Sequence, residues 1–225
     1  MRLALFGGTF DPIHRGHLAI AAAAAESFAL DRVIFAPTGK QPLKPDAPAA
    51  LFADRLQMTA LACAPDPRFA VSALDAPRPD GTPNYTLSLL QQLRSQHPEA
   101  GIFVLTGADS FLTIRQWRHP ERLLAEYEWI VVSRPGSSLT ETGLEPVQLT
   151  PAERDRIHLI TTMQEDVSAT ALRQRLATGD PCLDLIPGPV AAYIQAHRLY
   201  GAPPPKAAAA RDQAAIRSPP AEPEL

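Results

Sequence analysis

The sequence predicts an α/β protein in which a doubly wound parallel sheet carries helices on both faces. Short apolar runs without regular polar alternation recur along the chain, as expected for parallel strands buried on both sides. Helical patterns lie between most of these runs, and loops rich in glycine, proline or polar residues follow the strands. With 225 residues, of which 45% are hydrophobic and 20% are charged, the chain is long enough for one sizeable core.

The first three elements predict a right-handed strand–helix–strand unit. Residues 3–6 form a short apolar run typical of a buried strand, and the alanine-rich segment 18–28 predicts the helix that follows it. Residues 32–37 form the second strand. Because ligands of such sheets bind beyond the carboxyl ends of the strands, the loops after both strands are expected to face one crevice.

The next part of the chain predicts a helix, a strand, a loop and a second helix. Apolar residues at helical spacing indicate a helix over residues 49–64, with Arg55 on its polar face. Residues 69–73 alternate like a strand. The three prolines and the Asp-Gly pair within residues 76–84 predict a loop, and a helix then runs from residue 84 to about residue 97.

The second half repeats the same pattern and ends in a different composition. Further strands are predicted at residues 101–106, 128–133 and 156–161, a loop at 137–150, and a helix at 168–176. Residues 1–200 are therefore predicted to form one domain. Residues 201–225 are rich in proline and alanine, have little apolar volume to bury, and are predicted to form a disordered tail.

Charge and hydropathy restrict the possible partners. A net charge of −3 and an isoelectric point of about 6.1 provide no basic field for nucleic acid, so a small anionic ligand is expected to meet a local cluster of cations. The apolar runs near the amino terminus are too short for a signal peptide or a membrane span, so we expect a cytoplasmic protein without a membrane partner. Cys63 and Cys182 lack C-x-x-C spacing and are expected to be buried thiols.

The turn after the first strand concentrates unusual residues. Residues 7–17 read G-G-T-F-D-P-I-H-R-G-H. Gly7 and Gly8 remove side chains where the backbone must approach a ligand, and the amino terminus of the next helix favours an anion. His14 and His17 lie on one side of the helix mouth if the helix starts near His14. The turn therefore predicts a phosphate-binding site.

The turn contains neither the G-x-G-x-x-G fingerprint of dinucleotide-binding proteins nor a Walker A loop, so both of these sites are excluded. Two other interpretations of the turn remain open. Asp11, His14 and His17 could act as three metal ligands, but no cysteine or glutamate lies nearby to complete the set. The turn could also be a tight loop with surface histidines.

The turn resembles the G-G-T-F-D-P-x-H-x-G-H signature of the nucleotidyltransferase superfamily. This resemblance implies a Rossmann-like fold in which His14 and His17 handle the phosphates of ATP. It also implies that the residues just before them bind ATP. These residues are Gly7, Gly8, Thr9 and Phe10.

A second signature of the same superfamily, S-x-T-x-x-R, is matched by Ser168, Thr170 and Arg173. Ser168 is a plausible helix N-cap, and Arg173 lies near the mouth of that helix, where its guanidinium could meet a phosphate. A plain capped helix is the alternative. The resemblance implies that Ser168 and Thr170 bind ATP and that Arg173 is catalytic.

The loop after the second strand contains Lys40 and Lys44, either of which could reach a phosphate or remain an ordinary solvated lysine. The family loop ends in P-P-H-K, which resembles Pro42-Leu43-Lys44 with leucine in place of histidine. The resemblance therefore implies a catalytic role for Lys44.

Three further segments resemble the adenosine and acceptor sides of this family. Gly107 and Asp109 match its G-A-D turn, which implies contact with adenosine, although Asp109 could instead be a helix N-cap. Tyr85 and Thr86 match part of S-Y-T-x-D-T-L, from which Asn84, Ser88 and Leu89 depart. Trp117, which could simply pack in the core, resembles the aromatic residue that stacks on a pyridine ring.

Residues 186–200 resemble the closing helix of the same family, which predicts a helix there. Taken together, these motifs resemble the bacterial nicotinate-nucleotide adenylyltransferase family. The implied reaction joins nicotinate mononucleotide to the adenylyl group of ATP and releases pyrophosphate and deamido-NAD in NAD biosynthesis. Mg²⁺ is expected to arrive with ATP rather than in a dedicated protein cage. Three alternatives remain: a phosphopantetheine adenylyltransferase, a nicotinamide-mononucleotide adenylyltransferase, and a nucleotide-binding regulatory module without activity.

Overall fold

Six parallel strands form a single sheet in the order β3-β2-β1-β4-β5-β6. The structure is a computed structural model that describes residues 1–43, 48–133, 141–161 and 169–202. The strands are β1 (Arg2–Gly8), β2 (Arg32–Pro37), β3 (Phe69–Val71), β4 (Gly101–Gly107), β5 (Glu128–Ser133) and β6 (Ile157–Thr161). Every neighbouring pair in this order is parallel, which confirms the predicted Rossmann-like, doubly wound α/β fold. The strand order reverses between β1 and β4, and folds of this kind bind ligands at that reversal.

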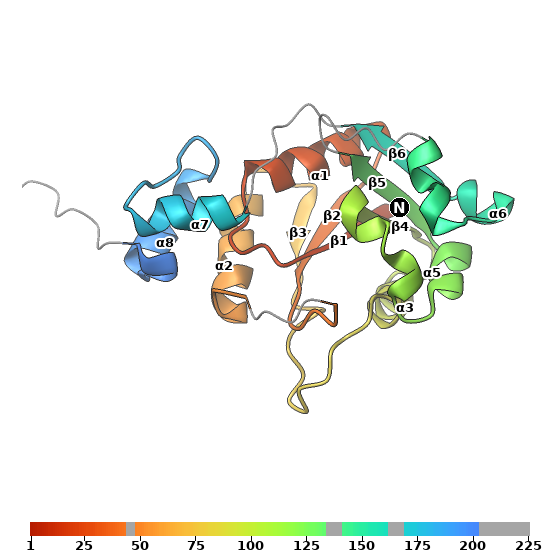
Figure 1. Ribbon diagram of the computed structural model, residues 1–225, viewed down its shortest axis with the longest axis horizontal. Helices are drawn as coiled ribbons and strands as arrows, with labels where there is room; N and C mark the ends of the chain where they lie inside the picture. Colours follow the sequence, from red (N-terminus) through yellow and green to blue (C-terminus); the bar gives the residue numbers. More distant parts are fainter. Residues whose placement is uncertain (44–47, 134–140, 162–168, 203–225) are drawn as a thin grey trace, which may run out of the picture.

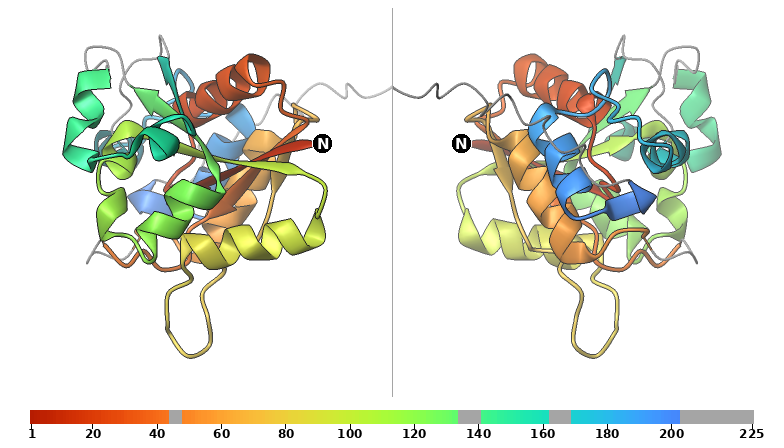
Figure 2. Two further views of the ribbon diagram at one scale, coloured as in Figure 1. Left: turned by 90° about the vertical axis from the view of Figure 1, so that its right-hand side faces the viewer. Right: turned by 90° about the vertical axis from the view of Figure 1, so that its left-hand side faces the viewer.

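Helices cover both faces of the sheet, as the views in Figure 1 and Figure 2 show. The α-helices are α1 (Arg15–Ser27), α2 (Phe52–Cys63), α3 (Thr86–Gln96), α4 (Ala108–Phe111), α5 (Pro120–Glu126), α6 (Pro151–Arg154), α7 (Ala169–Ala177) and α8 (Gly188–Ala196). The 3-10 helices are η1 (Ile114–Gln116), η2 (Glu141–Val147) and η3 (Leu199–Gly201). Among the residues described, no helix combines the length and apolar character needed to cross a bilayer.

Alternation along β1 separates two apolar cores. Ala4 and Phe6 face a core built with α1, α2, α7 and α8, whereas Leu3 and Leu5 face a core built with α3, α4, α5 and η2. All four strand residues are buried, which explains why β1 appears in the sequence as a continuous apolar run. In Figure 1 the helices α2, α7 and α8, which contribute to the first core, lie on one side of the sheet, and α3 and α5, which contribute to the second, lie on the other.

The predicted strands all exist, and the differences lie between and after them. The segment predicted as a loop at 137–150 contains η2, because Leu144 and Val147 lie three residues apart and both pack into the second core. The closing helix predicted at 186–200 is interrupted at Arg198, whose φ of 53° is left-handed, so α8 ends and η3 follows. Packing continues to Ala202, which is buried, two residues beyond the predicted domain boundary. The rest of the predicted tail lies outside the described residues.

Arg55 corrects one expectation about α2. The sequence places it on the polar face of the helix, but its side chain is only 1% exposed. Its Nη1 donates a 2.7 Å hydrogen bond to the carbonyl of Thr9, and its Nε donates to the carbonyl of Ala50. These two main-chain oxygens accept hydrogen bonds from the buried guanidinium and so offset part of the cost of removing its charge from water. Burial also lowers the pKa of Arg55. The predicted burial of Cys63 and Cys182 is confirmed.

A long loop between β3 and α3 projects from the layered body below α3 (Figure 2). It covers residues 72–85 and contains the predicted proline-rich segment. Its far end is tied back, because Lys40 Nζ donates a 2.8 Å hydrogen bond to the carbonyl of Gly81. The loop and the segment after β2 are thus connected at the edge of the sheet where ligands are expected.

Candidate active site

A cavity of about 470 Å³ lies at the carboxyl ends of the central strands. Its wall contains residues from the ends of β1, β2 and β4, from the base of the long loop, and from the start of α3. Seven of the predicted site residues line it. These are Gly7, Gly8, Thr9, Tyr85, Thr86, Asp109 and Trp117. The structure therefore brings the predicted mononucleotide residues together with much of the predicted ATP turn.

The glycines at this edge serve different purposes. A Cβ added at Gly7 or Gly107 would meet no protein atom within 4 Å, so these positions leave open space where a ligand can approach the backbone. A Cβ at Gly8 would lie 2.9 Å from the Phe10 ring, so Gly8 is required by packing inside the turn. Phe10 itself is 2% exposed and can offer a ligand only its main chain.

Trp117 lies at the cavity wall and is fixed from behind. Its indole Nε1 donates a 3.2 Å hydrogen bond to Thr113 Oγ1, and its ring meets that of Trp129 edge to face with centroids 5.9 Å apart. Across the wall, the guanidinium carbon of Arg118 lies 4.7 Å from the centre of the Tyr85 ring. Two aromatic rings and a cation thus frame the same space.

Asp109 lies in the first turn of α4, whose N-cap is Gly107. The alternative prediction, that Asp109 is itself the N-cap, is therefore wrong. A carboxylate in the first turn is favoured by the helix dipole, and Asp109 also lines the cavity. Its contact with a ribose stays a prediction.

His14 and His17 form a closely spaced, tilted pair at the start of α1. His14 is the N-cap, and the ring centres lie 3.7 Å apart with an interplanar angle of 32°. The main-chain N–H of His14 donates to His17 Nδ1 at 3.3 Å, which favours the neutral tautomer with its proton on Nε2. His14 is only 8% exposed, so the interpretation of a loop with surface histidines is wrong.

Asp11 organises the turn from within. Its carboxylate accepts hydrogen bonds from the main-chain N–H groups of Ala49 and Ala50 and from the hydroxyl of Tyr200, the last at 2.7 Å. Asp11 is thereby engaged by protein donors, and among the residues described no three histidine, cysteine or acidic side chains could hold a metal ion together. The geometry therefore gives no support to a three-ligand metal site at this turn.

Arg173, from the second signature, contacts the turn that contains the first. Its Nη1 donates a 2.9 Å hydrogen bond to the main-chain oxygen of Asp11 and lies 4.0 Å from the Asp11 carboxylate. Its Nη2 donates to Thr170 Oγ1 at 3.4 Å. The side chain remains 30% exposed beside the turn.

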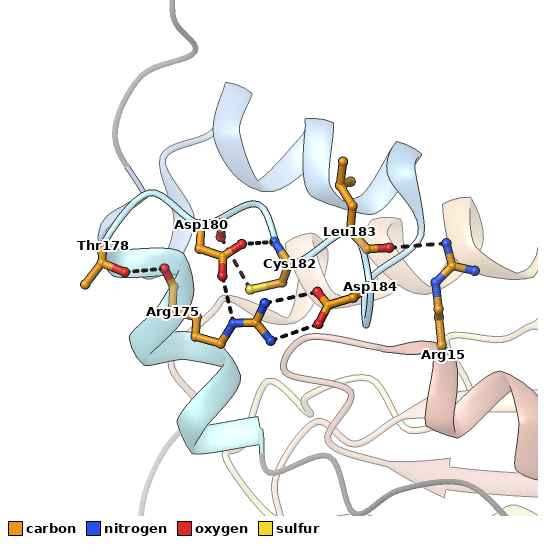
Figure 3. A network of polar contacts seen from close by, with 7 residues as sticks. All are labelled: Arg15, Arg175, Thr178, Asp180, Cys182, Leu183 and Asp184. Carbon is orange, nitrogen blue, oxygen red and sulfur yellow. Dashed lines mark hydrogen bonds and ion pairs between the residues drawn. The ribbon is translucent and has the colours of Figure 1, made fainter.

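A polar network seen in Figure 3 holds the segment after α7 against the start of α1. Arg175 pairs with Asp180 at 2.8 Å and with Asp184 at 3.0 Å. The N–H of Arg15, which begins α1, donates to the carbonyl of Leu185 at 2.7 Å. These contacts fix α7, and with it Arg173, relative to the mouth of α1.

The cavity wall does not include His14, His17 or Arg173, which lie at the neighbouring turn. Lys44 and Ser168 are outside the residues that the structure describes, so their predicted roles stay predictions. Lys40, the alternative lysine, lines the cavity.

Several polar residues of the cavity wall have no role predicted from the sequence, among them Asp75 and Asn84. Asp75 is 6% exposed, and desolvation raises its pKa to about 6, although hydrogen bonds from Asn84, Gly39 and Thr38 oppose this shift. The available signal was weak. Asn84 stands where the resembling motif has serine, and Asp75 is an acid just before a proline-rich loop.

Comparison with known proteins identifies a family and several relatives. Residues 5–175 match the model of the family described as cytidylyltransferase-like. A protein of Kineococcus radiotolerans named probable nicotinate-nucleotide adenylyltransferase is 43% identical over 197 residues, covering 88% of this chain and 90% of the relative. A protein of the same name from Roseiflexus sp. is 42% identical over 198 residues, covering 88% of this chain and 97% of the relative.

A solved structure supports the same fold. It is a nicotinic acid mononucleotide adenylyltransferase of Plasmodium falciparum in complex with NaAD, with a TM-score of 0.71 at 18% sequence identity. The likeness covers 88% of this chain and 97% of that chain. At this level of identity it shows a shared fold.

Proposed function

This chain belongs to the cytidylyltransferase-like family, and from that premise we propose that it is a nicotinate-nucleotide adenylyltransferase. The proposed reaction joins nicotinate mononucleotide to the adenylyl group of ATP and yields deamido-NAD and pyrophosphate. The strongest support is the contact between Arg173 and Asp11. The bond from Arg173 to Asp11 unites both phosphate signatures at the sheet edge that also holds the cavity with Trp117.

The proposed chemistry needs no general base. A 5′-phosphate monoester has a second pKa of about 6 and is largely dianionic at neutral pH. One of its oxygens attacks the α-phosphorus of ATP and forms the new P–O bond. The bond between the α-phosphorus and the bridging oxygen breaks, and pyrophosphate leaves with that oxygen. Catalysis then consists of positioning and of stabilising the charge that develops on the phosphates.

Side chains around the first turn would supply that stabilisation. The Nε2–H of His17, favoured by the bond to its Nδ1, is a donor for a phosphate oxygen. Arg173, whose side chain is 30% exposed, would offer its guanidinium to the phosphates. We propose His14 and Lys44 as further donors, and the first turn of α1 as an anion-binding end.

Mg²⁺ would be bound chiefly by the phosphates of ATP. The donor set fits this arrangement, because the Asp11 carboxylate is engaged by protein donors and the described residues contain no cluster of three metal-ligating side chains. The ion would neutralise part of the triphosphate charge, while Arg173 and His17 would orient the chain of phosphates.

The cavity suits the acceptor. Trp117 and Tyr85 provide aromatic surface for a pyridine ring, and α3 begins at Thr86 in the same wall. The positive end of a helix favours a carboxylate, which distinguishes nicotinate from nicotinamide. Asp109 would accept hydrogen bonds from a ribose diol.

The test is a pyrophosphate-release assay with ATP, Mg²⁺ and one acceptor at a time. Nicotinate mononucleotide, nicotinamide mononucleotide and phosphopantetheine are compared at equal concentration. We expect release with the pyridine mononucleotides, faster for the acid, and none with phosphopantetheine. Release with phosphopantetheine alone would assign a sister activity, and ATP binding without release with any acceptor would favour a regulatory module.

A further inference from the structure

The long loop between β3 and α3 is closed at its base by a carboxylate and an amide. Asn84 Nδ2 donates a 3.1 Å hydrogen bond to Asp75 Oδ1 and a 2.9 Å bond to the carbonyl of Ala76. Asp75 lies before the proline-rich part of the loop and Asn84 after it, and both line the cavity. Tyr85 and Thr86, the proposed acceptor residues, follow Asn84 directly.

The same carboxylate also holds the segment after β2. The hydroxyl of Thr38 and the N–H of Gly39 donate hydrogen bonds to Asp75. Thr38 in turn donates its main-chain N–H to the carbonyl of Gly8 at 2.8 Å. Gly39 fits so closely that a Cβ there would collide with the main-chain oxygen of Asp75. A continuous chain of bonds thus links the Gly8 turn to the start of α3.

We propose that Asp75 and Asn84 form a clasp that positions the two walls of the acceptor side of the cavity and thereby sets the affinity for the mononucleotide. The inference rests on the proposed function and deepens it by naming two positioning residues. Neither side chain needs to touch the reacting phosphates. Their effect passes through Thr38 on one wall and through Tyr85 and Thr86 on the other.

Charges around the clasp fit a carboxylate that remains ionised at neutral pH. Burial raises the pKa of Asp75 to about 6, still below 7, while the buried Arg55 guanidinium favours the charged form. Lys40, Arg118 and Asp109 line the same cavity. In the clasp, the Asp75 carboxylate accepts a hydrogen bond from the Asn84 amide. A hydrogen bond of this kind is strong when it is shielded from water.

Three variants test the clasp. Asn84→Asp places two carboxylates at hydrogen-bond distance and should open it. The double variant with Asp75→Asn and Asn84→Asp exchanges the two groups and restores one amide and one carboxylate. Asn84→Ser introduces the shorter residue of the resembling motif and remains neutral. Asp80→Asn is the matched control, because Asp80 lies in the same loop, is exposed, and accepts hydrogen bonds from the main-chain N–H and the hydroxyl of Thr82.

Steady-state kinetics with each substrate varied, together with calorimetric titration of nicotinate mononucleotide without ATP, provide the readout. Asn84→Asp should raise KM and Kd for the mononucleotide about tenfold, in keeping with one lost buried hydrogen bond, and leave kcat and KM for ATP within about twofold. Asn84→Ser should give a smaller rise in the same direction. The exchanged pair should recover part of the affinity, because a carboxylate at position 84 cannot donate to the carbonyl of Ala76, and Asp80→Asn should match the wild type.

Two results would overturn the clasp while leaving the proposed function intact. In the first, the wild type is active and both Asn84 variants keep its mononucleotide affinity. In the second, the exchanged pair recovers nothing although it melts like the wild type. A wild-type protein that neither binds the mononucleotide nor releases pyrophosphate would instead overturn the proposed function itself.

Discussion

Arg173 donates a hydrogen bond of 2.9 Å to the main-chain oxygen of Asp11 across 162 positions of sequence. This bond joins α7 to the turn between β1 and α1 and places a guanidinium next to the histidine pair. Because the side chain keeps 30% of its surface exposed, it can hold the turn and still meet a phosphate. The two signatures thus lie side by side although they are far apart in the sequence.

Arg173→Ala should weaken ATP binding by about 2 to 4 kcal/mol, the usual loss when a charged donor to a phosphate is removed from a partly shielded site. The measurement is the Kd for a non-hydrolysable ATP analogue. Arg68→Ala is the control, because Arg68 pairs with Asp66 just before β3, at the other end of the strands. Unchanged affinity in the Arg173 variant would place the triphosphate elsewhere.

His17→Ala should lower kcat by roughly 10² to 10³ while the fold stays intact, since one preorganised donor at developing charge is lost. His17→Asn, which retains an N–H donor, should recover part of the rate. The far-ultraviolet circular dichroism spectrum checks the fold of both variants. Near wild-type turnover in the alanine variant would remove His17 from the proposed mechanism.

Tyr200→Phe should reduce the free energy of unfolding by about 1 to 3 kcal/mol, because it leaves the buried Asp11 carboxylate one donor short. The matched control is Tyr193→Phe, which removes a similar 2.9 Å bond to Asp54, a carboxylate that is only partly buried, whereas Asp11 is buried. Urea unfolding followed by tryptophan fluorescence measures both. Equal and small losses would show that Tyr200 does not support the turn.

Asp75→Asn should change how stability depends on pH. In the wild type the folded-state pKa of Asp75 is raised from 3.8 to about 6, so stability from this group is present below about pH 4 and lost as pH rises through 6. The variant has no carboxyl group at this position, so it loses no stability through ionisation in this pH range. The difference in unfolding free energy should therefore move in favour of the variant between pH 4 and 6, by up to roughly 3 kcal/mol. Parallel stability curves for the two proteins would contradict the raised pKa.

The acid substrate should be preferred over the amide. The start of α3 at Thr86 presents main-chain N–H donors and a positive helix end, which suit a carboxylate. An amide would turn its own N–H₂ toward a donor, which costs about 1 to 3 kcal/mol, or one to two decades in kcat/KM. Competition between nicotinate and nicotinamide mononucleotide measures this ratio, and a ratio near one would indicate a dual-specificity transferase.

The strands could be predicted because their pattern is local. β2 and β5 have the predicted bounds, since each is a continuous buried run that ends in a proline or a polar residue. The position of His14 and His17 at one helix mouth also follows from their spacing, and the structure confirms it by starting α1 at Arg15.

The clasp and the buried guanidinium could not be predicted because their partners are distant or lie in irregular backbone. The local pattern places Arg55 on the solvent face of α2. Its burial depends on the carbonyl of Thr9, which is 46 residues away in the sequence. Asp75 and Asn84 are nine residues apart in a loop without helix or strand periodicity, so their contact depends on how the loop closes.

The proposed activity is adenylyl transfer from ATP to nicotinate mononucleotide. Its most direct test follows a radiolabel placed at the α-phosphorus of ATP in one reaction and at the γ-phosphorus in another, each with Mg²⁺ and nicotinate mononucleotide. We expect the α-label in a dinucleotide with the mass of deamido-NAD and the γ-label in pyrophosphate, in equal molar amounts. Release of the γ-label as inorganic phosphate, with no labelled dinucleotide, would contradict the account.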